Sequence, residues 1–233
     1  MVSTTRTEHI ERGGVRRLAL AACGLLAGCC LMAQAGPIVS GAAAALPGDV
    51  IARDLRHREA VDDEQLLAVI DTRSRALDRY GALEWRRELA TASVLPRGGK
   101  PTEAAAIDRS MAQTRIALAE GPASPQDWLR LAILESMKGQ RAAAAGHLST
   151  ALLTGADMRR LRRGVVDVGF YLWVDLPAET RVQTLAALRH TWQAGTKAER
   201  RALLSSMRER GFLPLARTVL SQEDGLQEEL DKL

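Results

Sequence analysis

The stretch SPQDWLRLAILESMKGQRAAAAGHLSTALLTG, residues 124–155, decides the fold. It opens with Ser124, a proline and Asp127, an order typical of a helix start. The serine oxygen accepts from free backbone amides, proline fits the first helical position, and the carboxylate meets the positive end of the helix dipole. We predict one helix over residues 125–138 and a second over residues 140–153. Their connection is brief, which favours an antiparallel pair.

Similar signals divide the rest of the chain into helices. Proline disrupts a helix interior by about 3 kcal/mol or more, and from Pro96 onward each proline lies where a helix can start or stop. The segments DDEQ at 62–65 and TKAE at 196–199 place a capping oxygen before a Gln or Glu at the spacing of a capping box. We predict further helices at about 50–60, 62–80, 82–94, 102–120, 157–174, 178–194, 197–210 and 213–232, with a break in the last near Ser221.

The composition agrees with an all-α chain. Hydrophobic residues make up 46% of the sequence, yet it contains only two Phe and two Tyr. Alanine and leucine, both strong helix formers, supply most of the apolar content. The net charge is +4, and residues 1–17 carry +2 of it because four arginines there oppose two glutamates, so the remainder also carries +2. This near-neutral remainder argues against nucleic acid as a partner.

Seven positions within residues 124–155 have the spacing of the tetratricopeptide repeat, which this stretch resembles. In that repeat a Trp and a Leu fill the space between paired helices, and small residues let the two backbones approach. Glu135 stands where that repeat usually has tyrosine, and Ala156 where it usually has proline. The resemblance covers residues 124–157 and implies a short α-solenoid of antiparallel helix pairs. The residues that carry it are Trp128, Leu131, Ala132, Gly139, Ala144, Leu148 and Ala151.

A second likeness concerns the longer segment 124–230. It is similar to the repeat-containing accessory proteins found beside bacterial exopolysaccharide and O-antigen assembly genes. That resemblance implies a scaffold or partner of polymerisation and export machinery rather than a catalyst.

The segment RRLALAACGLLAGCCLMAQAGPIVSGAAAAL, residues 16–46, carries no charge after its arginine pair. It has three possible fates: a retained single-pass helix, lipidation at Cys29 after the lipobox-like LAGC, or removal after AQA at 33–35. We favour retention, although Gly36-Pro37 would kink or end such a helix. The arginines predict that the domain faces outward, into the periplasm, in all three cases.

These signals divide the chain into four parts. Residues 1–17 are a basic cytoplasmic tail, 18–46 the signal or transmembrane anchor, 47–101 a helical extension and linker, and 102–233 the helical-repeat domain.

The residue types that act in catalysis in other proteins do not occur at catalytic spacing in this sequence. The sequence has no HExxH, GxSxG or GxGxxG motif, and all cysteines lie within residues 23–30, so we expect neither enzyme activity nor a metal or other cofactor. We expect a non-catalytic scaffold that binds a protein partner. The alternative is a helical enzyme or ligand-binding domain for cell-wall glycans, which would require a glutamate facing a cleft. The candidate partner contacts lie on the predicted helix 157–174, and they are Arg159, Arg160, Arg162, Arg163, Tyr171 and Trp173.

Overall fold

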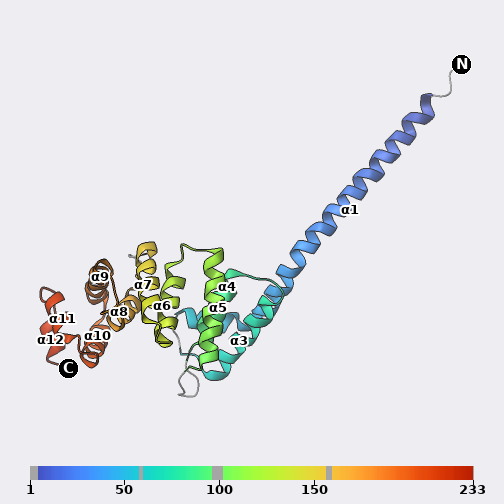
Figure 1. The fold of residues 1–233 in the computed structure, drawn as a ribbon. Coiled ribbons are helices and arrows are strands. Elements are labelled where there is room, and N and C mark those ends of the chain that lie inside the picture. The colour runs from blue at the N-terminus through green and yellow to red at the C-terminus, as the bar shows by residue number, and fades with distance from the viewer. Residues whose placement is uncertain (1–4, 58–59, 96–101, 156–158, 233) are drawn as a thin grey trace. The chain divides into compact units, whose positions relative to one another are not determined.

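The computed structural model describes the backbone of residues 5–57, 60–95, 102–155 and 159–232, and the side chains of these ranges except 5–21 and His57 (Figure 1). Every regular element in these described ranges is helical, which confirms the all-α prediction. The chain divides into two compact units, residues 1–88 and 89–233.

The first unit contains the N-terminal helices. They are α1 (Thr5–Ala45), a short 3-10 turn (Leu46–Gly48), α2 (Asp49–His57), α3 (Asp63–Leu77) and the first part of α4 (Leu83–Ser93). Helix α3 starts as predicted, because the Asp62 carboxylate accepts from the Gln65 amide while the Gln65 side chain accepts from the Asp62 amide. Both bonds of the capping box are therefore present.

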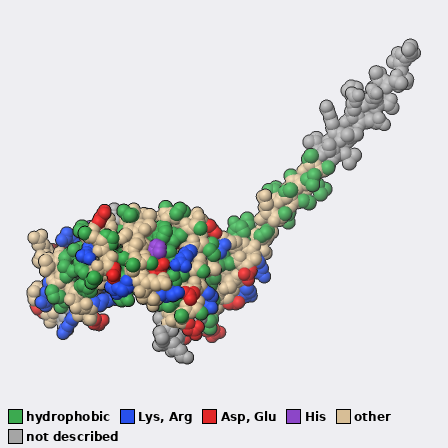
Figure 2. Space-filling model, in the orientation of Figure 1, with side chains coloured by type: hydrophobic (Ala, Val, Ile, Leu, Met, Phe, Trp, Pro, Cys, Tyr) green, Lys and Arg blue, Asp and Glu red, His purple; other side chains and the backbone are tan. Residues whose placement is uncertain are grey.

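Helix α1 runs through Pro37, so the break expected there does not occur. Every side chain from Ala22 to Ser40 is exposed, and hydrophobic side chains predominate along this part of the helix (Figure 2). The stretch is long and apolar enough to be a membrane anchor or a signal sequence. Burial begins only at Gly41.

The end of α1 is fixed by a buried arginine on α3. The Arg73 guanidinium, 1% exposed, donates to the Ala45 carbonyl at 2.7 Å, to Asp49 at 2.8 Å and to Glu88 at 2.5 Å. Charge-assisted hydrogen bonds of this kind compensate the desolvation of the guanidinium. The last turn of α1 is thus part of the folded unit and is joined to it without a linker.

The second unit contains the rest of α4 and the remaining helices. These are α5 (Ala104–Glu120), α6 (Pro125–Met137), α7 (Arg141–Gly155), α8 (Arg162–Tyr171), α9 (Ala178–Ala194), α10 (Lys197–Glu209), α11 (Leu213–Val219) and α12 (Leu226–Leu230). Their bounds lie within a few residues of the predicted ones, except at α8. The predicted break near Ser221 separates α11 from α12.

Helices α6 and α7 form a hairpin whose core positions match the repeat-like residues. The side chains of the aliphatic residues in that set are at most 2% exposed, and Gly139 in the turn adopts the left-handed φ of 74° that glycine tolerates best. Trp128 is only half-buried, which differs from the expected burial between the two helices. Its indole Nε1 donates to the Pro122 carbonyl at 2.7 Å, and this bond holds the polar edge of the ring at the surface. The relation to the tetratricopeptide repeat stays a prediction.

Candidate functional site

The candidate partner contacts gather at the turn that follows α8. This helix ends at Tyr171, so residues 172–175 form a turn where the sequence predicted three more helical positions. The turn is tight because the Trp173 amide donates to Phe170 and the Asp175 amide to Leu172. Pro177 just beyond cannot donate to a continuing helix.

The side chains around this turn differ sharply in exposure. Phe170 is 1% exposed and Trp173 is half-buried, whereas Tyr171 is 46% and Val174 79% exposed. Successive positions along a helix point in different directions, so these neighbours cannot all be buried on one face. The structure assigns Tyr171 and Val174 to the surface.

Two arginines from two other helices hold the turn in place. Arg141, at the start of α7, donates to the Tyr171 carbonyl at 2.9 Å, and Arg181 of α9 donates to the Val174 carbonyl at 3.0 Å. Arg210, just after α10, donates to the Asp167 carbonyl inside α8 at 2.7 Å. Carbonyls at the end of a helix lack partners within the helix, and guanidinium groups supply them. The conformation of the turn is therefore set by residues distant in sequence.

Two of these arginines also cover aromatic rings. The Arg141 guanidinium lies 4.9 Å from the centre of the Tyr171 ring, and that of Arg181 lies 5.8 Å from the Trp173 ring. Arg141 also pairs with Asp175 at 2.7 Å, and this hydrogen bond raises the pKa of the guanidinium above its usual value.

A shallow hollow of about 200 Å³ opens beside the turn. Its floor is an aromatic stack, since the Phe170 ring lies 5.3 Å from that of Trp173 and 5.0 Å from that of Phe212. The hollow is apolar, with one arginine at its edge. Its lining residues are Phe170, Tyr171, Trp173, Val174, Arg210 and Phe212.

The basic group does not lie on one helix, which corrects the predicted start of helix 157–174. Arg159 and Arg160 belong to the turn before α8 and are exposed, whereas Arg162 and Arg163 form its first turn and are half-buried. Arg163 pairs with Asp167 at 3.0 Å. Positively charged arginines are unfavourable near the N-terminal end of a helix, which carries the positive end of its dipole. No side chain caps the start of α8. The sequence therefore lacks a signal that would start this helix further upstream.

A buried carboxylate that sequence reasoning did not assign links α5, α6 and α7. Glu135, 2% exposed, lies 2.7 Å from the Nδ1 atom of His147, and Arg115 lies 3.4 Å from its other oxygen. The His147 ring stacks on Trp128 with centres 5.3 Å apart. The predicted hairpin would have placed Glu135 and His147 opposite each other, since they flank its turn. Both carboxylate oxygens of Glu135 thus contact side chains of neighbouring helices.

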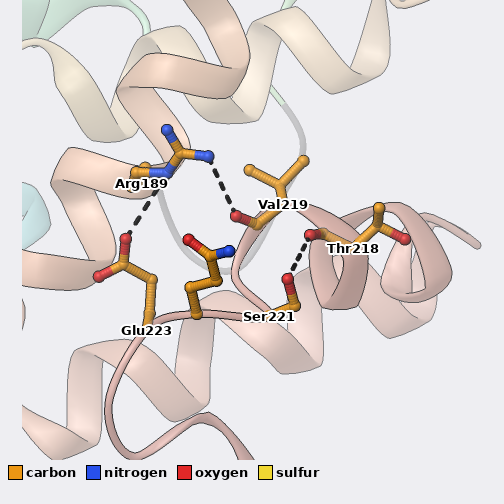
Figure 3. A pocket seen from close by; sticks show the side chains of 6 residues that line it. Arg189, Thr218, Val219, Ser221 and Glu223 are labelled. Carbon is orange, nitrogen blue, oxygen red and sulfur yellow. Dashed lines mark hydrogen bonds and ion pairs between the residues drawn. The ribbon is translucent and has the colours of Figure 1, made fainter.

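A second hollow, of about 360 Å³, lies between α9 and the segment joining α11 to α12 (Figure 3). Arg189 donates to the Val219 carbonyl at 3.3 Å and lies 3.6 Å from Glu223, and the Ser221 hydroxyl donates to the Thr218 carbonyl at 3.0 Å. Glu223 also accepts from the Gln193 amide at 3.0 Å. The charged groups of this hollow, Arg189 and Glu223, are thus bound within the chain.

The two remaining questions are the candidate lipidation site on α1 and the presence of a metal site. Cys29 is exposed on α1, as are the other cysteines. Within the described ranges, His, Cys, Asp and Glu side chains form no group of three that could hold a metal ion. No protein-family model matches the chain, and comparison with curated proteins and with solved structures gave no match.

Proposed function

We propose that this chain is a non-catalytic, membrane-tethered helical-repeat scaffold that faces the periplasm and binds a protein partner through the turn after α8. The process we assign to it is the assembly or export of an envelope polysaccharide, on the likeness of residues 124–230 to accessory proteins of such systems. One observation carries the binding proposal: an exposed apolar turn is held in place by arginine side chains from two other helices.

The chemistry of the turn suits protein recognition. Binding energy at protein interfaces is concentrated in a few aromatic and arginine side chains near the centre of the contact. Tyr171, Trp173 and Val174 offer such an apolar centre beside the aromatic hollow, and Arg159 and Arg160 add positive charge on the same unit. Because the turn is already ordered, a partner would not bear the entropic cost of fixing it.

The tether rests on helix α1. Its exposed apolar part continues without a loop into the buried end that Arg73 holds. Removal after Ala35 and lipidation at Cys29 would both leave this buried end in place. The preference for retention therefore rests on the apolar helix itself, which runs unbroken through Pro37.

Capture of the partner tests the proposal. The full chain, extracted from membranes in mild detergent, serves as bait, because residues 41–46 belong to the folded unit. Val174→Asp places a charge on the turn and should lower the yield of the specific partner at least about tenfold, the scale of one hot-spot residue. The matched control is Val182→Asp on α9, since Val182 is 66% exposed and does not line the hollow. Equal capture by both variants would refute the assignment of the turn.

Charge reversal at Arg159 and Arg160 tests the basic part of the surface. Both side chains are exposed on a turn, so the variant should fold normally and show reduced capture. Unchanged capture would mean that these arginines do not contact the partner.

The alternative, an enzyme acting on cell-wall glycans, requires a free carboxylate in a cleft. Glu223 in the larger hollow is the nearest approach to this, but it is bound by Gln193 and Arg189. Cleavage of peptidoglycan by the purified chain that is lost in Glu223→Gln would favour the enzyme over the scaffold.

A further inference from the structure

The length of α1 sets where the first unit meets a membrane, and this inference rests on the proposed retention of α1 as an anchor. A bilayer core of about 30 Å takes about 20 helical residues at 1.5 Å each. Counted from Leu18, which follows the arginine pair, this span ends near Pro37. The interfacial layer beyond it, roughly 5–7 Å thick, takes the next four or five residues. Gly41 lies within that layer.

Two aromatic side chains pack against α1 at this level. A Cβ atom added to Gly41 would lie 3.0 Å from both the Trp85 ring and the Tyr80 Cβ. The two rings meet edge to face, with centres 6.3 Å apart. The backbone of α1 therefore touches this pair directly, and the pair cannot lie at a different depth from Gly41. Tryptophan and tyrosine are enriched at membrane–water interfaces, where the apolar ring and the polar tip both find suitable surroundings.

The surroundings of the pair have the character of an interface. Tyr80 is 41% exposed and lies in the turn between α3 and α4, next to the exposed Arg79. On the domain side of Gly41, Leu46 and Val50 are 64% and 63% exposed. Apolar side chains that are exposed beside an apolar helix continue its surface into the folded unit.

We propose that the turn between α3 and α4, with the Tyr80–Trp85 pair, lies in the phospholipid headgroup layer on the domain's side of the membrane. The first unit is thus seated on the lipid surface. Cationic Arg79 suits headgroup phosphate, and the aromatic pair suits the boundary between headgroups and acyl chains.

Depth-dependent fluorescence quenching tests this contact. The full chain is placed in nanodiscs of phosphatidylcholine with a quarter phosphatidylglycerol, in which the lipids carry bromine on acyl carbons near the headgroup. Quenching should be seen in the unmodified chain and be largely lost in Trp85→Phe. The matched control is Trp128→Phe, because Trp128 packs on His147 in the second unit, and it should keep the quenching.

Carbonate extraction of native membranes separates this inference from the tether on which it rests. A chain released by carbonate would overturn both the retained anchor and the headgroup contact. A chain that resists extraction, but whose quenching is the same with and without Trp85, would overturn the headgroup contact alone. That result would mean that the aromatic pair does not reach the headgroup layer.

Discussion

Replacement of Gly169 by alanine should destabilise the second unit, because α8 and α9 approach closely at this point. The new Cβ would lie 2.5 Å from Thr184 Cγ2 and 2.8 Å from Thr184 Oγ1. Thr184 cannot easily move away, since it is fully buried and its hydroxyl donates to the Thr180 carbonyl at 2.8 Å. Overpacking of this kind costs about 1–3 kcal/mol.

The matched control is Gly146→Ala on α7. A Cβ at Gly146 meets nothing within 4 Å, so this variant gains the helix propensity of alanine over glycine, about 1 kcal/mol, without a clash. The propensity gain is common to both sites. The difference in unfolding free energy between Gly146→Ala and Gly169→Ala therefore isolates the packing cost, and it should be about 1–3 kcal/mol.

Urea unfolding of the full chain in detergent, followed by far-UV circular dichroism, measures both values. A second substitution, Thr184→Ala, removes the two closest atoms and leaves a Cβ–Cβ distance of 3.3 Å, so it should restore much of the lost stability. If Gly169→Ala instead stabilises the chain as much as Gly146→Ala does, α8 and α9 lie further apart than described. The turn that follows α8 would then not be positioned as we argue.

Three further predictions concern other parts of the chain. His147→Ala should cost about 1–3 kcal/mol, because it leaves the buried Glu135 carboxylate short of a partner; a second change, Glu135→Leu, should recover most of that loss in urea unfolding. Glu228 has its pKa lowered from 4.5 to about 2 by hydrogen bonds from two lysines, so its contribution to stability is complete above about pH 4.5 and is lost as the pH falls through 2. Acid unfolding curves of Glu228→Gln should lack this component, and identical curves would contradict it. Alkaline phosphatase fused after Pro47 should be active, and an inactive fusion would reverse the orientation; fatty-acid labelling that disappears in Cys29→Ser would favour a lipoprotein.

The sequence predicts most helices because their ends are encoded locally. Asp62 and Thr196 each form both bonds of a capping box, and Ser124 accepts from the Asp127 amide as the first helix of the hairpin begins. Such a cap involves residues only three positions apart, so a pattern in the sequence is enough to find it. The start of α8 lacks a cap of this kind, and it is the boundary that the sequence misplaced.

The candidate surface depends instead on contacts between distant residues. Whether Tyr171 or Trp173 is exposed is decided by the turn after α8, where Arg141 binds the Tyr171 carbonyl and Arg181 binds the Val174 carbonyl. These arginines are distant in sequence from the turn, so no local sequence pattern predicts their contacts with it. The pairing of Glu135 with His147 has only a weak signal in the sequence, because it can be inferred only once the hairpin and its register are known.

The use of these arginines also bears on what a partner can recognise. Arg181 donates to a backbone carbonyl of the turn, so replacing it would loosen the turn as well as remove a charge. Loss of capture in such a variant would not separate the two effects. Val174→Asp avoids this difficulty because the valine side chain is 79% exposed. It changes the surface that a partner meets and leaves every carbonyl bond of the turn in place. Recognition at this turn is therefore expected to be apolar, with the positive charge supplied by the separate turn that carries Arg159 and Arg160.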